Sequence, residues 1–589
     1  MPATPSTTIN STVSSRPRPA STGCAARSVV MDSVVTVASS GGRSLSQTLG
    51  GTPHLGNHGF VPLTNWFLTA PERDNDVSDI PAWATGNTAE PLIHGATYFD
   101  RLVTAVEEMS EGDHLFFTDW RGDPDERMRP EGPTVAELFC QAAKRGVVVK
   151  GLMWRSHLDK LQYSEEENRH LGEAIEEAGG EVLLDQRVRP GGSHHQKLVV
   201  LRHPGRPERD VAFAGGIDLC HSRRDDADHR GDPQAVRMSA RYGDHPPWHD
   251  VQLQLRGPVV GALDTSFRER WTDPTPLDSH SPIAWARDKV SGADLSAGEL
   301  PPQPPDPSPT GPHAVQVLRT YPSLRRSQPF APGGERTIAR GYTKAIKRAR
   351  RLIYLEDQYL WSGEVADLFA EALTQSPDLH LIAVVPRYPD VDGKLAWPPN
   401  QVGRAKALEV CRRAAGDRVH VFDVENHESH PVYVHAKVCV VDDVWASVGS
   451  DNFNRRSWTH DSELSCAVLD ETRDARPPTD PAGLGDGARV FARDLRLRLL
   501  REHLDRATDG SEDADLIDPA DAVAAVTAHA QALADWHEGG EVGPRPPGRL
   551  VPHEPERLSR LTRLWAIPAY RLIYDPDGRS RRHRRSGTW

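Results

Sequence analysis

Apolar residues recur at helical spacing in two distant parts of the chain, and a strand-like run follows each of them. In the first part, a helix is predicted over 97–109, with apolar positions at Phe99, Leu102, Val103 and Val106. The run HLFFTDW from His114 predicts the strand that follows. In the second part, a helix is predicted over 335–349, and RLIYLEDQYL from Arg351 is its strand. The chain therefore contains an internal repeat.

The repeat continues through two further helix–strand pairs in each half. TVAELFCQAAKRGVVVKGLMW from Thr134 parallels EVADLFAEALTQSPDLHLIAVV from Glu364. A third helix is predicted over 165–176, before EVLLD, and its counterpart over 401–413, before RVHVFDV. Each half then reaches a strand with the pattern H-x-K, which is followed by a second strand and a turn of small residues.

Strands that alternate with helices predict an α/β fold. We expect two tandem homologous α/β/α sandwich domains with mixed sheets and an active site at their interface. The predicted domains are 56–292 and 314–510, joined by a linker over 293–313 that contains LPPQPPDPSPTGP and cannot continue a helix or a central strand. Residues 1–55 are predicted to be disordered, and 511–589 to form a C-terminal helical extension with a basic tail.

Charge and cysteine content narrow the classes of function. Asp and Glu number 83 against 70 Lys and Arg, and the formal net charge of −13 argues against a general nucleic-acid binder. No run of about 18 apolar residues occurs, so no membrane-spanning helix is predicted. The six cysteines lack the spacing of metal ligands, which favours free thiols in a reducing compartment. We expect a monomeric cytoplasmic protein that binds no nucleic acid and contacts membranes only peripherally.

The two H-x-K strands carry the candidate chemistry, His195 with Lys197 and His435 with Lys437. One such pair is usually structural, but two copies at the same place in a repeated unit can face each other across one cleft. Two ammonium groups and the small-residue turns would attract a phosphate diester. One neutral imidazole can then attack phosphorus while the other, protonated, donates a proton to the leaving alcohol. This chemistry requires no metal or other cofactor.

These residues resemble the phospholipase D superfamily, whose signature is HxKxxxxD followed by a glycine-containing turn, once in each half. HAKVCVVDDVWASVGSDN from His435 matches the signature in full, with Asp442 in the aspartate position. Four more stretches resemble the phosphatidylcholine-hydrolysing branch: GGID, WHDVQLQLRGP, IYLEDQYL and DSEL. The resemblance covers 83–469. It implies a phospholipase D that converts glycerophospholipids such as phosphatidylcholine to phosphatidic acid, or transfers the phosphatidyl group to an alcohol.

The resemblance also implies roles for individual residues. His195 would be the nucleophile, and His435 the general acid and then the general base. Glu463 would orient His195 and Asp250 would orient His435, so each acid would serve the histidine of the other half. The substrate would be bound by Lys197, Lys437, Gly215, Gly216, Asp218, Ser450 and Asn452. Glu356 and Gln358, which alternate onto one face of a strand, are expected near the same site.

The first motif departs from the family pattern. Arg202 stands where the signature has aspartate, and the distance from Lys197 to Gly215 is six residues longer than the matching distance in the second half. The extra residues fall in HPGRPERD, which predicts an enlarged hairpin turn in which Asp210 or Glu208 replaces the missing acid. If so, an Arg202→Asp exchange would change activity little. A catalytically dead first half is the alternative.

Other functions stay open beside the phospholipase. They are a cardiolipin-synthase-like phosphatidyl transferase, a nuclease or other phosphodiesterase, and a non-catalytic lipid-binding protein that Arg202 alone supports. His194 is expected to be structural. His221, Arg223 and Arg224 follow the GGID turn and either touch the substrate or form a solvated loop. The tail RSRRHRR from Arg579 either attracts anionic lipid or only aids solubility.

Overall fold

The computed structural model describes residues 62–156, 165–236, 238–277, 296–324, 328–390, 392, 397–556 and 558–589. The described residues belong to one compact unit. The prediction of disorder for 1–55 lies outside the described residues. Among those that are described, no helix is both long enough and apolar enough to cross a membrane.

In the first half, the described residues form a mixed sheet of seven strands. Strands β2, β3 and β4 run parallel to one another, and the other neighbours in the sheet are antiparallel. The order across the sheet is β1 (Ala84–Ile93), β8 (Val251–Arg256), β6 (Val211–Gly215), β5 (Leu198–Arg202), β2 (His114–Asp119), β3 (Val148–Trp154) and β4 (Glu181–Asp185).

The second half repeats this arrangement strand for strand. Its order is β9 (His313–Tyr321), β17 (Glu463–Asp470), β16 (Trp445–Gly449), β15 (Lys437–Val441), β11 (Leu352–Asp357), β12 (His380–Val384) and β13 (Val419–Glu425). The parallel strands are again the three at one end of the order, β11, β12 and β13. The repeat and the mixed α/β fold predicted from the apolar pattern are therefore confirmed.

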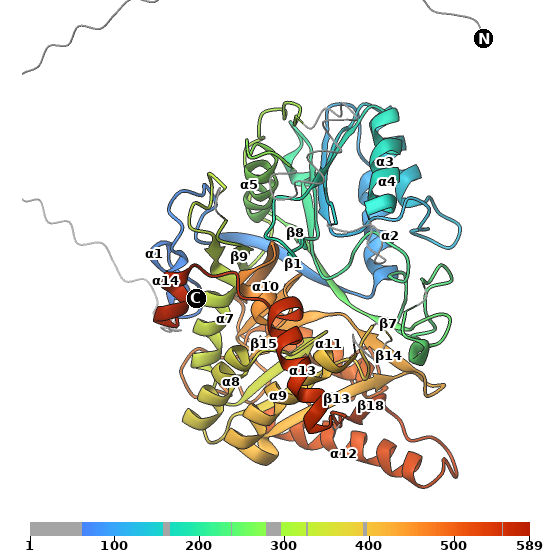
Figure 1. The fold of residues 1–589 in the computed structure, drawn as a ribbon, viewed down its shortest axis with the longest axis vertical. Coiled ribbons are helices and arrows are strands. Elements are labelled where there is room, and N and C mark those ends of the chain that lie inside the picture. The colour runs from blue at the N-terminus through green and yellow to red at the C-terminus, as the bar shows by residue number, and fades with distance from the viewer. Residues whose placement is uncertain are drawn as a thin grey trace, which may run out of the picture. The chain divides into compact units, whose positions relative to one another are not determined.

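Helices cover both faces of each sheet (Figure 1). The outer helices of the first half are α2 (Gly95–Glu107), α3 (Val135–Lys144) and α4 (Glu165–Glu177), and those of the second are α7 (Thr337–Arg348), α8 (Gly363–Gln375) and α9 (Trp397–Ala415). On the opposite faces, α5 (Val259–Trp271), α11 (Val490–His503) and α12 (Pro519–Glu538) share one hydrophobic core with both sheets.

Strand β2 shows why these strands lack the alternation of apolar and polar residues. Leu115 and Phe117 lie in the core beneath the outer helices, whereas Phe116 lies in the central core. Successive side chains of a strand point to opposite faces, and here both faces are covered. Local signals set the helix ends: in α3 the Thr134 side chain accepts from the amide of Glu137, and the Glu137 side chain accepts from that of Thr134.

The two halves join along backbone pairings that flank the H-x-K segments. β1 pairs with β9, and β7 (Trp248–His249) pairs with β14 (Pro431–Val434). Between these junctions, the amide of His195 donates to the carbonyl of Ser462 at 2.9 Å, and the amide of His435 donates to the carbonyl of His249 at 2.8 Å. Each histidine is thus fixed beside the segment of the other half that carries an acid, Glu463 or Asp250.

One local prediction needs correction. The histidines were expected within the H-x-K strands, but β5 begins at Leu198 and β15 begins at Lys437. His195 and His435 lie in extended segments just before the strands, because their amides bond to the other half rather than to a neighbouring strand of their own sheet.

Candidate active site

His195 is held through one ring nitrogen by a carboxylate of the other half. Its Nδ1 lies 2.9 Å from Oε2 of Glu463, and the same oxygen accepts from the hydroxyl of Ser450 at 2.6 Å. When Nδ1 carries the proton shared with the carboxylate, Nε2 bears the lone pair and is available to react. The His195 side chain is 15% exposed, so substrate can reach it.

His435 is held in the mirrored way. Its Nδ1 lies 2.6 Å from Oδ2 of Asp250, whose other oxygen accepts from the amide of Val251 at 2.8 Å. The ring of Trp248 packs against His435, with the centroids 5.0 Å apart. The contacts therefore pair Glu463 with His195 and Asp250 with His435, the crossed arrangement that the resemblance implied.

The two lysines lie beside the histidines and are buried. Lys197 Nζ donates to the carbonyl of His195 at 3.1 Å and lies 3.0 Å from Oδ1 of Asp218. Lys437 Nζ donates to the carbonyl of His435 and lies 3.5 Å from Oε1 of Gln358. Burial and the charge of Lys197 together lower the pKa of Lys437 to about 8, against the opposing effect of Asp250.

The site is strongly cationic around His435. Burial, with the charges of Lys437 and Arg223, holds the pKa of His435 well below its usual value, so the ring is neutral in the free protein. A phosphodiester bound among these cations adds a negative charge and favours the protonated ring. The arrangement can therefore bind a phosphate and couple that binding to protonation of His435.

The small-residue turns allow carboxylates and hydroxyls to approach the backbone closely. A Cβ atom on Gly216 would lie 2.1 Å from Oδ1 of Asp250, and a Cβ atom on Gly215 would lie 2.7 Å from the carbonyl of Val251. In the second half, a Cβ atom on Gly449 would lie 1.7 Å from Oγ of Ser465. Asn452 is buried after this turn, and its Oδ1 makes no hydrogen bond. Glycine is thus required at 216, where the carboxylate of Asp250 lies against the turn and reaches His435.

Two site residues were missed or left undecided by the sequence. Asp119, at the end of β2, is buried, and its Oδ2 accepts from the amide of Leu219 after the GGID turn. Burial and the charge of Asp218 raise the pKa of Asp119 well above its usual value. The repeat itself could have revealed it, since Asp119 ends β2 as Asp357 ends β11.

Arg223 is the site residue whose role the sequence left undecided. Its guanidinium lies 3.9 Å from the centre of the Trp248 ring, and it pairs with Asp218 at 3.3 Å. Burial opposes ionisation of Asp218, but Lys197 and Arg223 outweigh it and hold the pKa of that carboxyl below its usual value. Arg223 belongs to the site by contact, while His221 pairs with Asp123 and Asp125 at its edge.

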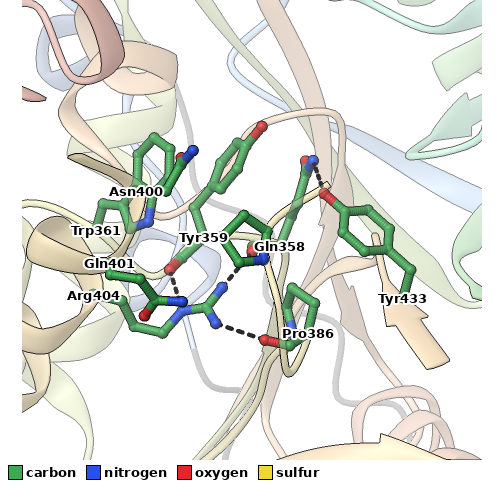
Figure 2. A pocket seen from close by; sticks show the side chains of 9 residues that line it. Gln358, Tyr359, Trp361, Pro386, Asn400, Gln401, Arg404 and Tyr433 are labelled. Atoms are coloured by element: carbon green, nitrogen blue, oxygen red, sulfur yellow. Dashed lines mark hydrogen bonds between the residues drawn. The ribbon is translucent and has the colours of Figure 1, made fainter. Parts of the chain in front are cut away.

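The structure separates Glu356 from Gln358. Gln358 lies beside Lys437 and donates to the hydroxyl of Tyr433 at 2.7 Å. It lines a pocket with aromatic side chains, and Arg404 braces that pocket through backbone carbonyls (Figure 2). Glu356 instead accepts from His249 and His503 and from the hydroxyl of Tyr354. The prediction that both line the substrate site is therefore wrong for Glu356, whose side chain is taken up by these partners.

Arg202 points away from the histidines and is fully buried. Its guanidinium donates to Asp210 at 2.7 Å, to Asp264 at 2.8 Å, and to the carbonyls of Pro304 and Pro305. It therefore fixes the proline-rich segment to β5 and α5. The contact with Asp210 is local pairing across the hairpin, and both halves retain a histidine, a lysine and a paired acid.

His194 is buried beside Gln196, with Nε2 of the ring 3.3 Å from Oε1 of the amide. Among the described residues, two overlapping sets of histidine and glutamate lie close enough to share an ion. They are His94, His229, His249 and Glu502, and His249, Glu356 and His503.

Comparisons with known proteins find phospholipase D-like sequences. A family model described as phospholipase D matches residues 125–296, and one described as cardiolipin synthase, PLD-like domain, matches 342–475. Phospholipase D alpha 1 of Oryza sativa subsp. japonica is 24% identical over 523 residues, covering 67% of this chain and 62% of the relative. The Arabidopsis thaliana protein of that name is 26% identical, with the same coverage.

Phospholipase D A of Dictyostelium discoideum is 25% identical and covers 69% of this chain and 35% of its own length. The chain thus spans about 62% of the length of the plant relatives that it matches. Among solved structures, phosphatidylserine synthase of Haemophilus influenzae Rd KW20 aligns with a TM-score of 0.46 at 12% identity, covering 69% of this chain and 87% of that one.

Proposed function

Because the chain belongs to the phospholipase D superfamily, we propose that it is a phosphodiesterase acting on glycerophospholipids such as phosphatidylcholine. The observation that carries this proposal is the crossed pair of contacts, His195 with Glu463 and His435 with Asp250. Two imidazoles held at Nδ1, each with a buried lysine beside it, suit a reaction that needs a nucleophile, an acid and a phosphate-binding site.

In the first step, Nε2 of His195 attacks phosphorus. A P–N bond forms, the P–O bond to the head-group alcohol breaks, and protonated His435 gives its proton to the departing oxygen. In the second step, neutral His435 takes a proton from water or an alcohol, whose oxygen attacks phosphorus and breaks the P–N bond. The products are a phosphatidic acid, or a phosphatidyl ester of the acceptor, and the regenerated histidines.

The assignment of nucleophile follows the environments of the two rings. His195 is the more accessible, 15% exposed against 6% for His435. His435 lies among cations that a bound phosphate would neutralise, which suits a group that must gain a proton when substrate arrives. Lys197, Lys437 and Asn452 would hold the phosphate oxygens through both steps, because preorganised donors stabilise the charge that develops on them.

We also propose that the protein works at a phospholipid surface. The C-terminal surface, by which we mean α13 (Arg560–Ala569) and the helical turn Tyr570–Tyr574, exposes the apolar side chains of Leu561, Leu564, Trp565, Ile567, Leu572 and Ile573. Exposed arginines lie among and after them, and the acids Asp575 and Asp577 are buried or half-buried. Apolar side chains mixed with cations fit the interface of an anionic bilayer.

This surface adjoins the pocket beside Lys437. The Tyr570 ring contacts Trp361, and the Tyr570 hydroxyl accepts from the amide of Ser362. A Leu564→Asp, Leu572→Asp protein should bind vesicles containing phosphatidylserine at least about tenfold more weakly in sedimentation. It should still act on a soluble short-chain substrate. Val542→Asp, at an exposed apolar position elsewhere, is the matched control. Unchanged vesicle binding by the double variant would disprove the surface.

The central test offers phosphatidylcholine vesicles and ethanol to the purified protein. Phosphatidylethanol and free choline are the expected products, and His195→Ala should give neither. Parallel reactions with phosphatidylglycerol as acceptor and with single-stranded DNA address the alternatives. Formation of cardiolipin in preference to phosphatidylethanol would favour the transferase, which the family model matched by the second half suggests. Cleavage of DNA alone, or no turnover of any diester, would overturn the lipid proposal.

A further inference from the structure

Behind the active site, three histidines and one glutamate converge on a single buried point between the halves. Nε2 of His94 lies 2.7 Å from Oε2 of Glu502, and Nε2 of His229 lies 3.1 Å from its Oε1. Nδ1 of His249 lies 3.4 Å from Oε1 of Glu502. All three histidines are almost fully buried, and the Glu502 side chain is 11% exposed.

We propose that His94, His229, His249 and Glu502 bind one divalent metal ion. Three imidazole nitrogens and a carboxylate form a donor set that zinc takes in tetrahedral geometry. Their four ligand atoms lie within 4.8 Å of one another. Metal-to-ligand bonds of about 2.0–2.2 Å separate tetrahedral ligand atoms by a little over 3 Å, which these contacts approach.

The orientation of His249 points to a cation. Its Nε2 lies 2.7 Å from Oε2 of Glu356, so Nδ1 is the ring nitrogen that faces Glu502. Nδ1 lies 3.4 Å from Oε1 of Glu502 and makes no hydrogen bond. A metal ion between this nitrogen and the carboxylate would be bound by both.

The surroundings resemble those of metal-bound histidines. A ligating histidine usually donates its other ring N–H to a carboxylate or a backbone carbonyl. His249 does so to Glu356, which also accepts from His503 at 2.8 Å, and Nδ1 of His229 lies 3.2 Å from the carbonyl of Trp248. The carboxylate of Glu356 is fully buried and that of Glu502 nearly so, and both face these imidazoles.

The backbone is strained where two ligands are presented. His94 has φ of 70° and His229 has φ of 53°, in the left-handed region that non-glycine residues rarely adopt. Such strain persists where the surroundings hold a side chain in place for a purpose. Here it turns both rings toward Glu502, which stands in α11 of the second half.

The ion would join the halves close to the chemistry without touching the substrate. His94, His229 and His249 come from the first half and Glu502 from the second, and His249 precedes Asp250, the partner of His435. A structural metal departs from the metal-free protein expected from the sequence. It does not depend on the proposed function, since it concerns the junction and not phosphoryl transfer.

The test is elemental analysis of the untagged full chain purified without chelators from zinc-supplemented cells. The wild type should hold about one zinc per chain, and cobalt exchanged into the site should give the intense visible absorption of tetrahedral coordination. His229→Ala and Glu502→Gln should lose both signals. His503→Gln should still bind zinc but about 10–100-fold more weakly. His553→Asn, which alters a buried histidine paired with Asp423 elsewhere, should bind normally.

Wild-type protein that is folded, lacks stoichiometric metal and shows no cobalt absorption would overturn the proposal without any variant. Metal retained by both His229→Ala and Glu502→Gln would also overturn it. Thermal unfolding of the wild type gives an independent measurement, because an ion bound only by the native state raises Tm. A chelator should therefore lower Tm of the wild type and of His553→Asn but not that of His229→Ala, and an unchanged wild-type Tm on complete removal of zinc would count against the proposal.

Discussion

The two halves share one order of strands but use the fifth position after the motif lysine in different ways. In the second half, Asp442 accepts from the amides of Arg350, Arg351 and Leu352, which ties β15 to the start of β11. In the first half, Arg202 pairs with two aspartates and fixes the proline-rich segment. Side chains of opposite charge at the same position therefore both make structural contacts, but Asp442 joins two strands whereas Arg202 holds a connecting segment.

A second difference concerns the charge around each lysine. Lys197 has a carboxylate partner, Asp218, at 3.0 Å. Asn452 occupies the corresponding place in the second half and brings no charge to Lys437. The histidines differ too, since the His435 side chain is less exposed than that of His195 and lies near the charges of Lys437 and Arg223. The repeated unit thus supplies two similar frames, and the side chains around them make the two sites chemically unequal.

The largest effect should come from the histidines and should separate their roles. His195→Ala is expected to lower kcat by about 10⁴-fold or more for every substrate, because the nucleophile is lost. His435→Ala should be as damaging with phosphatidylcholine but far less so with a p-nitrophenyl phosphodiester, whose leaving group needs no proton. Initial rates with both substrates measure this. His430→Ala, at an exposed position, is the control. The reverse pattern would exchange the two roles.

The next largest effect should come from the two acids. Asp250→Asn and Glu463→Gln should each lower kcat by about 10²–10⁴-fold, since the amide removes the charge that orients a histidine. Gly216→Ala should imitate Asp250→Asn, because the added Cβ would collide with the Asp250 carboxylate. Steady-state kinetics with Asp228→Asn as a surface control measures these effects. Loss of Glu463 should slow every substrate, whereas loss of Asp250 should slow mainly those whose leaving group needs a proton. If Gly216→Ala slowed the p-nitrophenyl diester as much as Glu463→Gln does, the crossed pairing would be wrong.

Arg202 should matter for stability and hardly for the chemistry. Arg202→Met removes the buried cation that Asp210 and Asp264 share, leaving Asp264 with Arg268, and should cost about 3 kcal/mol of unfolding free energy. Activity per folded molecule should stay near that of the wild type. Denaturant unfolding and active-site-normalised rates check the two statements. An Arg202→Met protein of normal stability but low specific activity would contradict the comparison of Arg202 with Asp442.

The sequence predicted that Arg202→Asp would change activity little, and that stays a prediction. The structure adds that this exchange should lower stability, because a third carboxylate would replace the cation that Asp210 and Asp264 share. Asp442→Asn should cost less, about 1–2 kcal/mol, since an amide oxygen replaces only part of what the carboxylate accepts.

The smallest predicted effect is a difference in pH dependence. The pKa of Lys437 is lowered to about 8, so kcat/KM should fall as pH rises through that value and the phosphate-binding charge is lost. The corresponding fall in kcat should appear at higher pH than the fall in kcat/KM, because a bound phosphate favours the protonated lysine. Rates for a soluble diester from about pH 6 to about pH 10 provide the measurement.

Lys437→Arg should remove this fall in kcat/KM. Asn452→Asp gives Lys437 a carboxylate partner like that of Lys197, so it should move the fall to higher pH. If the fall persisted in Lys437→Arg, another group would be responsible for it.

The sequence by itself determined the repeat, the α/β class, the helices and strands to within a few residues, and the two H-x-K pairs. These features depend on apolar spacing and short motifs, which are local. The resemblance added the crossed acids, and the contacts of Glu463 and Asp250 match that implication.

Only the tertiary structure decided what Arg202, Glu356, Asp119 and Arg223 contact, and that His94, His229 and His249 meet Glu502. Arg202 bonds to carbonyls about a hundred residues away, and Glu502 lies several hundred residues from His94 in the chain. A buried charge takes its role from whichever partners folding brings to it, because in a desolvated place the nearest opposite charge or donor outweighs every local preference.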